Sequence, residues 1–329
     1  MKKQEFIKSP SLHNGAEALV HHCAGLKPAE KVLIITDAAT FKIGESIKEI
    51  AVSFGSVVTH VTVGNLNMHG QEPPDDVAEK MLTHQVIFGL TTMSMAHTLA
   101  CQKALKNQAR YLSLPDYSLE LLASPSLQVD FLSLTPTVER LTDILTQGKV
   151  LKVTSELGTD VTINIAGRTA NSAPGWCHAG GSLASPPDAE SNIAPLEGES
   201  NGVIVIDGSI PCRDVGLLKE PLRVVIKQGQ ISEIHGPQSQ TVSRVLDRLQ
   251  NSKTRILGEV GFGLNPQAEL KGVMLEDEGC LGTVHFGFGS NTLLGGRNQV
   301  PFHLDMVMRL PTVFVDDKKI YDKGRLISS

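Results

Sequence analysis

The amino-acid sequence predicts an α/β fold class, with an open parallel-sheet α/β domain followed by a β-rich α+β domain. Between about residues 31 and 115, short β-branched runs alternate with helical stretches, as expected of a parallel sheet covered by helices. After about Gly148 the pattern changes to short strands separated by glycine-rich turns. The 329 residues also exceed what one hydrophobic core usually serves, so we expect two domains, 1–148 and 149–329.

The first domain has a regular succession of predicted elements. Strands are expected at 31–36, 57–63, 86–90 and 109–114, and helices at 41–54, 74–84 and 95–106. Sheets of this kind often bind nucleotides. However, the turn after the first strand, Asp37-Ala38-Ala39-Thr40, lacks the GxGxxG pattern, and the sequence contains no P-loop. We therefore expect no nicotinamide cofactor.

The second domain is predicted to be mostly β-structure. Hairpins are expected at 149–168, around residues 157–160, and at 222–234, turning at residues 228–230. A strand is expected at 202–206 and a helix at 241–250. Residues 171–199 are rich in Gly, Pro, Ser and Ala. This segment is longer than a simple connection between two elements, so we expect a functional loop there.

Composition excludes several classes of function. The formal net charge is −5 with acidic and basic residues scattered, so no nucleic-acid partner is expected. No run approaches the roughly 18 apolar residues of a membrane span, and the first ten residues carry no apolar signal-peptide core. We therefore predict a cytoplasmic protein. The five cysteines are widely spaced without a CxxC pair, which argues against a disulfide framework and a thiolate zinc site.

Three segments of the second domain share one design. They are Glu259–Leu264 (EVGFGL), Val284–Gly289 (VHFGFG) and Phe302–Met306 (FHLDM). Successive residues of a strand face opposite sides, so the apolar residues would face the core while Glu259, His285, His303 and Asp305 share the other side. Glycines leave the polar side bare beside Glu259 and His285, which predicts a hollow there.

These polar side chains predict a metal-binding site. Neighbouring strands lie about 4.8 Å apart, so ligands on the same face of adjacent strands are within reach of one or two cations. Imidazoles and carboxylates without thiolates suit zinc, cobalt, manganese or iron(II). A single His or Glu on a strand is more often a structural residue, and glycines can mark bulges. Three similar segments within about fifty residues nevertheless favour a divalent metal.

Several motifs resemble one known family. They are Gly258-Glu259-Val260, the Asp277-Glu278 pair followed by Gly282–Gly289 (GTVHFGFG), Asn298 leading to Phe302–Asp305 (FHLD), and in the first domain Leu26–Ile34, Met95–Ala100 and Ala109–Pro115. They resemble the thermophilic-type metallo-aminopeptidases, the aminopeptidase S and T family, whose more compact relatives include 2,5-dihydroxypyridine 5,6-dioxygenase. The likeness covers most of the chain. The segment between His285 and His303 is shorter than in the peptidases, which brings the chain nearer to the compact branch.

The resemblance implies a ligand set. The aminopeptidases hold two divalent metals with two glutamates, two histidines and an aspartate, which would here be Glu190, Glu259, His285, His303 and Asp305. The assignment of Glu190 depends on its spacing to Pro195 and the strand at 202, and the other interpretation is a solvated loop acid. The peptidases also carry a tyrosine shortly after the histidine matched by His285, where this chain has Ser290-Asn291-Thr292. The family implies a homodimer.

Two mechanisms are compatible with this set. The main interpretation is a metal-dependent hydrolase resembling leucyl aminopeptidase, in which one or two zinc, cobalt or manganese ions activate water to attack an amide carbonyl of a peptide or other small molecule. The retained Glu259 favours it. The alternative is a mononuclear iron(II) ring-cleaving dioxygenase resembling 2,5-dihydroxypyridine 5,6-dioxygenase, with His285, His303 and Asp305 as a facial triad. A third interpretation is a metal-binding relative without catalysis.

Three further residues are assigned roles in the site. Glu278 would shuttle a proton, or would only support the ligands. His97, which the resemblance places in the active cleft, would act as acid or base on the substrate of a dioxygenase, and its ordinary interpretation is a capping or core histidine. Arg297 would bind a substrate carboxylate, although an exposed loop arginine is the commoner explanation.

Overall fold

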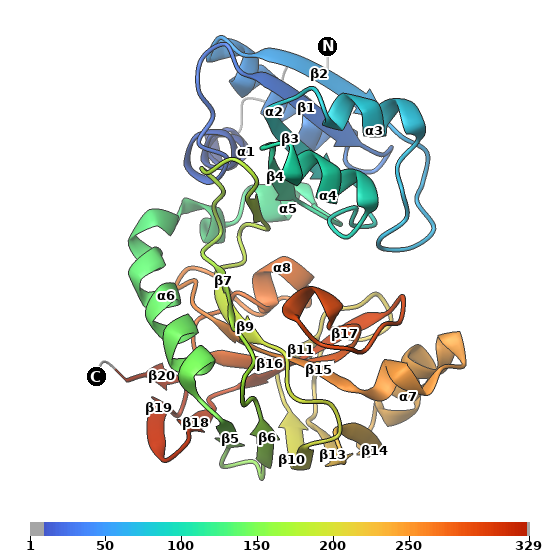
Figure 1. Ribbon diagram of the computed structural model, residues 1–329, viewed down its shortest axis with the longest axis vertical. Helices are drawn as coiled ribbons and strands as arrows, with labels where there is room; N and C mark the ends of the chain where they lie inside the picture. Colours follow the sequence, from blue (N-terminus) through green and yellow to red (C-terminus); the bar gives the residue numbers. More distant parts are fainter. Residues whose placement is uncertain (1–9, 328–329) are drawn as a thin grey trace. The chain divides into compact units, whose positions relative to one another are not determined.

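The structure is a computed structural model that describes residues 10–327, and the chain forms two compact units (Figure 1). The first comprises the described residues up to Ser133 together with Gly175–Pro187, and the second comprises Leu134–Pro174 and the residues from Asp188 onward. The predicted boundary near residue 148 differs from this division. The reason is helix α6 (Phe131–Gln147), most of which packs into the core of the second unit.

The first unit is built around a parallel sheet with strand order β2-β1-β3-β4-β8. Its strands are β1 (Lys31–Thr36), β2 (Val57–Thr62), β3 (Val86–Leu90), β4 (Arg110–Ser113) and β8 (Leu183–Ala184). Its helices are α1 (Pro10–Glu17), which continues as a π-helix (Ala18–Cys23), α2 (Phe41–Ser53), α3 (Asp75–Met81), α4 (Leu99–Lys106), α5 (Leu119–Leu122) and a 3₁₀ turn (Pro125–Gln128). The predicted open α/β fold of this part is confirmed.

Sequence and burial agree along this sheet. The apolar strands β1 and β3 are almost wholly buried, as expected of parallel strands covered on both faces, whereas the edge strand β2 is half exposed. Helix α4 begins at Leu99 rather than at the predicted Met95. The hydroxyl of Thr98 accepts a hydrogen bond from the Cys101 amide at 3.1 Å and so caps the helix at that point.

The second unit contains two antiparallel sheets. The eight-stranded sheet has the order β14-β13-β10-β6-β5-β18-β19-β20, and the seven-stranded sheet has the order β12-β11-β17-β16-β15-β9-β7. The first consists of β5 (Val150–Thr154), β6 (Asp160–Asn164), β10 (Ser200–Ile206), β13 (Leu222–Lys227), β14 (Gln230–His235), β18 (Thr312–Val315), β19 (Lys318–Asp322) and β20 (Arg325–Leu326). The second consists of β7 (Asn171–Ala173), β9 (Glu190–Ile193), β11 (Ser209–Ile210), β12 (Gly216–Leu217), β15 (Leu257–Gly263), β16 (Thr283–Gly289) and β17 (His303–Arg309).

Helices α7 (Ser239–Leu246) and α8 (Met274–Asp277) and 3₁₀ turns at Asp247–Leu249, Ser252–Arg255 and Thr292–Leu294 complete the second unit. Both predicted hairpins form, β5 with β6 and β13 with β14. The second turns at Gln228 and Gly229, which both have positive φ, as a tight hairpin turn requires.

One hydrophobic core joins the two sheets and α6. It takes apolar residues from alternate positions of β15, β16 and β17, including Val260, Phe262, Phe286 and Met306. This confirms the predicted inward face of these strands, and it leaves their polar positions on the opposite face. The predicted long loop at 171–199 is instead interrupted by β7, β8 and β9.

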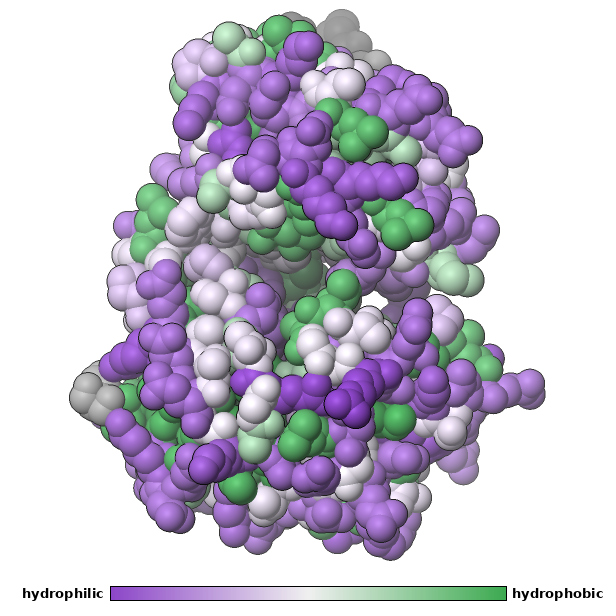
Figure 2. Space-filling model, viewed as in Figure 1, coloured by the Kyte–Doolittle hydropathy of each residue, from purple (hydrophilic) through white to green (hydrophobic). Residues whose placement is uncertain are grey.

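The visible surface mixes hydrophilic and hydrophobic residues. Figure 2 shows a face on which hydrophilic residues predominate and hydrophobic residues are scattered among them. Among residues 10–327, no helix combines the length and the apolar character needed to span a membrane.

Candidate metal centre

Five acidic and imidazole side chains lie on adjacent strands of the seven-stranded sheet. Glu190 starts β9, Glu259 lies in β15, His285 in β16, and His303 and Asp305 in β17. These strands are neighbours in the order β17-β16-β15-β9. The structure therefore brings together all five residues that the sequence analysis proposed as ligands.

Each of the five residues lies opposite a glycine on a neighbouring strand. The pairs are Glu190 with Gly263, His285 with Gly261, His303 with Gly289, and both Glu259 and Asp305 with Gly287. A Cβ atom on Gly261 would lie 2.0 Å from His285 Nε2, and one on Gly287 would lie 2.7 Å from His303 Nε2. The side chains of His285 and Glu190 thus lie over Gly261, and those of His303 and Glu259 lie over Gly287, in the space that the sequence analysis predicted to be a hollow.

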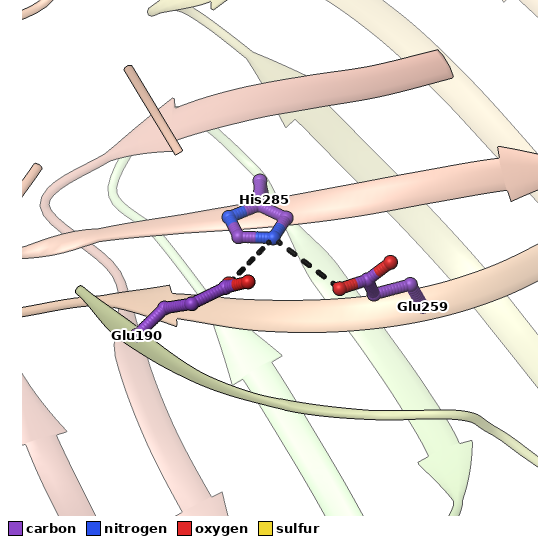
Figure 3. A group of neighbouring side chains, drawn as sticks. All are labelled: Glu190, Glu259 and His285. Atoms are coloured by element: carbon purple, nitrogen blue, oxygen red, sulfur yellow. Dashed lines mark ion pairs between the residues drawn. The ribbon is translucent and has the colours of Figure 1, made fainter. Parts of the chain in front are cut away.

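A first group of ligand atoms surrounds His285. Its Nε2 is 3.2 Å from Glu190 Oε2 and 3.8 Å from Glu259 Oε1. Figure 3 shows the imidazole facing both carboxylates. Ligand atoms of these three residues all lie within 4.8 Å of one another. The His285 side chain is only 2% exposed, so this group is closed to solvent.

A second group surrounds His303. Its Nε2 is 3.1 Å from Glu259 Oε2 and 3.3 Å from Asp305 Oδ1, and the three residues also have ligand atoms within 4.8 Å of one another. The His303 side chain is 35% exposed, so this group is accessible. Glu259 belongs to both groups and separates the two histidines. The facial triad of His285, His303 and Asp305 expected for the alternative mechanism is therefore not one of these compact groups.

The arrangement of buried polar atoms fits a cation. Glu190 Oε2, His285 Nδ1 and Asp305 Oδ1 are buried and have no hydrogen-bond partner among the described residues. The Glu190 oxygen lies 3.2 Å from His285 Nε2 and the Asp305 oxygen lies 3.3 Å from His303 Nε2, but neither forms a hydrogen bond. Buried polar groups are normally hydrogen-bonded, so ligand atoms left without a hydrogen bond at these distances are compatible with a cation between them. Carboxylate and imidazole donors suit divalent transition metals.

Electrostatics favour a positive charge between these groups. Burial lowers the pKa of both His285 and His303, but the adjacent carboxylates outweigh it and hold both pKa values well above the ordinary histidine value. Burial raises the pKa of Glu259 and Asp305, but the two histidines outweigh it and hold both pKa values below the ordinary range. Without a metal, protons on the imidazoles supply the positive charge, and a cation would replace them.

Two further acids adjoin the ligands. Burial first, and then Glu190, raises the pKa of Asp188 well above its ordinary value, and Asp188 Oδ1 has no hydrogen-bond partner among the described residues. Sequence reasoning missed Asp188. Its signal was the two-residue spacing to Glu190, the same spacing that identified His303 and Asp305. Burial and then Asp305 likewise raise the pKa of Glu278, which follows α8 and keeps Oε1 buried and unbonded within the described chain.

The other two predicted site residues lie on exposed segments. His97 is in the first unit, in the turn before α4. Arg297 is in the loop between β16 and β17, and its backbone amide donates a 2.6 Å hydrogen bond to Glu197 Oε1. The roles of both side chains remain predictions.

Comparison with known proteins identifies the family. The model of the family described as 2,5-dihydroxypyridine 5,6-dioxygenase matches residues 16–328. The chain belongs to this family. A curated 2,5-dihydroxypyridine 5,6-dioxygenase from Pseudomonas putida is 25% identical over 196 residues, which cover 56% of this chain and 56% of the relative. The match therefore spans little more than half of that relative's length.

Solved structures show the same fold. A 2,5-dihydroxypyridine dioxygenase from Pseudomonas putida superposes with a TM-score of 0.81 at 19% identity, covering 100% of this chain and 99% of the other. Wild-type AmpT from Thermus thermophilus gives a TM-score of 0.70 at 14% identity, covering 97% and 99%. At these identities the likeness establishes the fold alone. It confirms the α/β architecture with a parallel sheet and antiparallel sheets.

The comparisons correct the predicted activity. The hydrolase interpretation, with its aminopeptidase and metalloprotease character, is wrong, because the family model and the curated relative both indicate a dioxygenase. The resemblance to the compact branch is confirmed, and the likeness to AmpT extends to the fold only. The inference from the retained Glu259 to a hydrolase is therefore not supported. What stands is an enzyme family with residues arranged to hold a divalent metal.

Proposed function

We propose that this protein is an iron(II)-dependent dioxygenase that cleaves a hydroxylated, pyridine-like ring. Family membership supports the reaction class. The observation that carries the proposal is the group of Glu259, His303 and Asp305, whose ligand atoms converge beside an accessible histidine. Catalytic metal sites keep an open position for substrate or oxygen, and structural sites are closed. The accessible group would hold the iron, while the buried Glu190 and His285 would support it through Glu259.

Iron(II) bound here would supply the oxygen and one-electron chemistry that amino-acid side chains lack. The protein's own residues would hold the substrate and manage protons. Burial raises the pKa of Glu278 well above its ordinary value, which favours the protonated form, and this carboxyl group would donate its proton from Oε1 to a ring oxygen. Arg297 would attract an ionised hydroxyl or carboxylate of the ring. His97 would act as an acid or base on the substrate.

Other parts of the proposal follow from the same family. The substrate is a small molecule, consistent with the dioxygenase relatives. We keep two further predictions, a homodimer, which the family resemblance implies, and a cytoplasmic location, which the sequence indicates. Size-exclusion chromatography with light scattering would test the first, and fractionation of the source cells would test the second.

Protein purified without air or chelator provides the decisive test. We expect one iron per chain by elemental analysis and oxygen uptake when 2,5-dihydroxypyridine is added, with loss of its ring absorbance. A His303→Ala variant should lose both. Iron-loaded protein that consumes no oxygen with a panel of hydroxylated pyridines and benzenes would overturn the proposal and favour a metal-binding relative without catalysis.

A further inference from the structure

A set of hydrogen bonds among Ser290, Asn291, Asn298, Glu197 and His303, called the lock below, holds the loop that joins two strands of the proposed metal site. This loop, residues 290–302, runs from β16 to β17 and therefore connects His285 to His303. His303 Nδ1 lies 3.0 Å from the carbonyl oxygen of Ser290, the first residue of the loop. A carbonyl oxygen can only accept, so Nδ1 must carry the hydrogen. In the neutral ring, Nε2 then presents its lone pair to Glu259 and Asp305.

The residues on either side of Ser290 are fixed by a pair of asparagines. Asn298 donates its backbone amide to Asn291 Oδ1 at 2.8 Å, and Asn291 donates its backbone amide to the Asn298 carbonyl at 3.1 Å. The Asn298 side-chain amide also donates to the Gly289 carbonyl at 2.6 Å. Both asparagines are buried. The loop is thus closed into a ring, and the Ser290 carbonyl has little freedom to turn away from His303.

Glu197, which is about 100 residues away in the sequence, accepts hydrogen bonds from both ends of this loop, at Asn291 and at Arg297. Its Oε1 accepts the Asn291 side-chain amide at 2.9 Å and the Arg297 backbone amide at 2.6 Å. Its Oε2 pairs with Arg168 Nη2 at 2.7 Å, and the Arg168 side chain is only 10% exposed. Arg168 also donates to the carbonyl oxygens of Pro195 and Gly295. Oε1 of Glu197 therefore binds the loop, and Oε2 is held in place by Arg168.

We propose that Glu197 is a positioning residue that sets the tautomer and orientation of His303 through Asn291 and Ser290. Histidines that bind metals usually donate their other ring N–H to a fixed acceptor, and loss of such support costs about 10–100-fold in metal affinity. His285 Nδ1 has no such partner among the described residues, so the lock acts on the accessible group alone.

Three variants test this inference. Glu197→Ala removes all three contacts of the carboxylate. Asn291→Asp changes one group and turns the 2.9 Å hydrogen bond to Glu197 into a contact between two carboxylates. The control is Glu199→Ala, two residues away, because Glu199 accepts a side-chain amide from Asn164 at 2.7 Å and makes no contact with the loop in the described structure.

Two readouts apply to each variant. The first is the His303 tautomer in metal-free protein, measured by ¹⁵N-histidine NMR at one fixed pH above the raised pKa of His303, where the ring is neutral, and assigned with His303→Gln. The second is Mn(II) affinity, followed by the EPR signal of the free ion. We expect Glu197→Ala and Asn291→Asp to mix the two tautomers and to weaken Mn(II) binding about 10–100-fold. Glu199→Ala should match the wild type in both measurements.

The outcomes separate this inference from the proposed function, on which its metal arm depends. If wild-type protein binds no Mn(II) or iron, the proposed function fails, and the tautomer measurement still decides the lock. If both loop variants keep the wild-type tautomer and the wild-type Mn(II) affinity, the lock is refuted. Should Glu197→Ala fail to fold, Asn291→Asp decides between these outcomes, because its side chain has the same size as that of the native residue.

Discussion

Replacing Gly261 with alanine tests the geometry of the metal centre with a single methyl group. The added Cβ would lie 2.0 Å from His285 Nε2, 2.2 Å from its Cε1 and 2.7 Å from Glu190 Oε2. An ordinary contact begins at 3.4 Å, so the imidazole must move by about 1.4 Å. His285 contacts Glu259, which would bind the metal in the accessible group, and loss of such support costs about 10–100-fold in metal affinity. We therefore expect metal affinity to fall by about 10–100-fold.

The fold should survive this change. Overpacking of a well-packed site costs about 1–3 kcal/mol, which is less than the usual stability of a domain. Circular dichroism and urea unfolding would establish that the variant is folded, and Mn(II) titration would measure the affinity. Gly64→Ala is the matched control, because a Cβ there has no atom within 4 Å and the backbone is not left-handed. A folded Gly261→Ala protein with wild-type metal affinity and stoichiometry would refute the proposed packing of ligands over glycines.

Two further predictions follow from the pKa shifts. Because the pKa values of His285 and His303 are raised in the folded state, their stabilising charge interactions are complete below the unfolded value of about 6.5 and are lost as pH rises through the folded values. In metal-free protein, the free energy of unfolding measured with urea should thus fall as pH increases above about 6.5. The affinity for Mn(II) should rise over the same pH range, because protons no longer compete for the histidines. If neither quantity changed with pH, the assigned ion pairs would be contradicted. Glu278→Gln mimics the protonated acid that burial favours, so stability should not fall, whereas turnover in the oxygen-uptake assay should fall about 100-fold or more if Glu278 supplies a proton.

Local periodicity was sufficient to predict most strands and the faces of β15, β16 and β17. Alternation of apolar and polar residues has a period of two only on a strand, so Val260 and Phe262 had to face one side and Glu259 the other. The same pattern could not show which strands are neighbours. Adjacency depends on tertiary packing, and it also explains why every proposed ligand lies opposite a glycine, a feature that no single segment reveals.

Other features had weaker local signals. Helix α6, which contains Pro136, was not predicted, and its apolar side fills the core of the second unit. Glu190 lies in a segment with the composition of a loop, and this segment becomes a strand by pairing with β15 on one side and β7 on the other. The contact of Glu197 with Arg297 joins residues 100 positions apart, so the lock was beyond any local pattern.

The loop after β16 illustrates how one fold can carry different local contacts. The chain has the same architecture as AmpT, but function is determined by the site and not by the fold. At the position where the resembling peptidases carry a tyrosine, this chain has Ser290-Asn291-Thr292. Here Ser290 and Asn291 use their polar groups to fix His303 and the loop, and a phenol at residue 291 would remove the contact to Glu197. The residues in place of the tyrosine thus hold the loop beside His303, the accessible histidine of the proposed metal site.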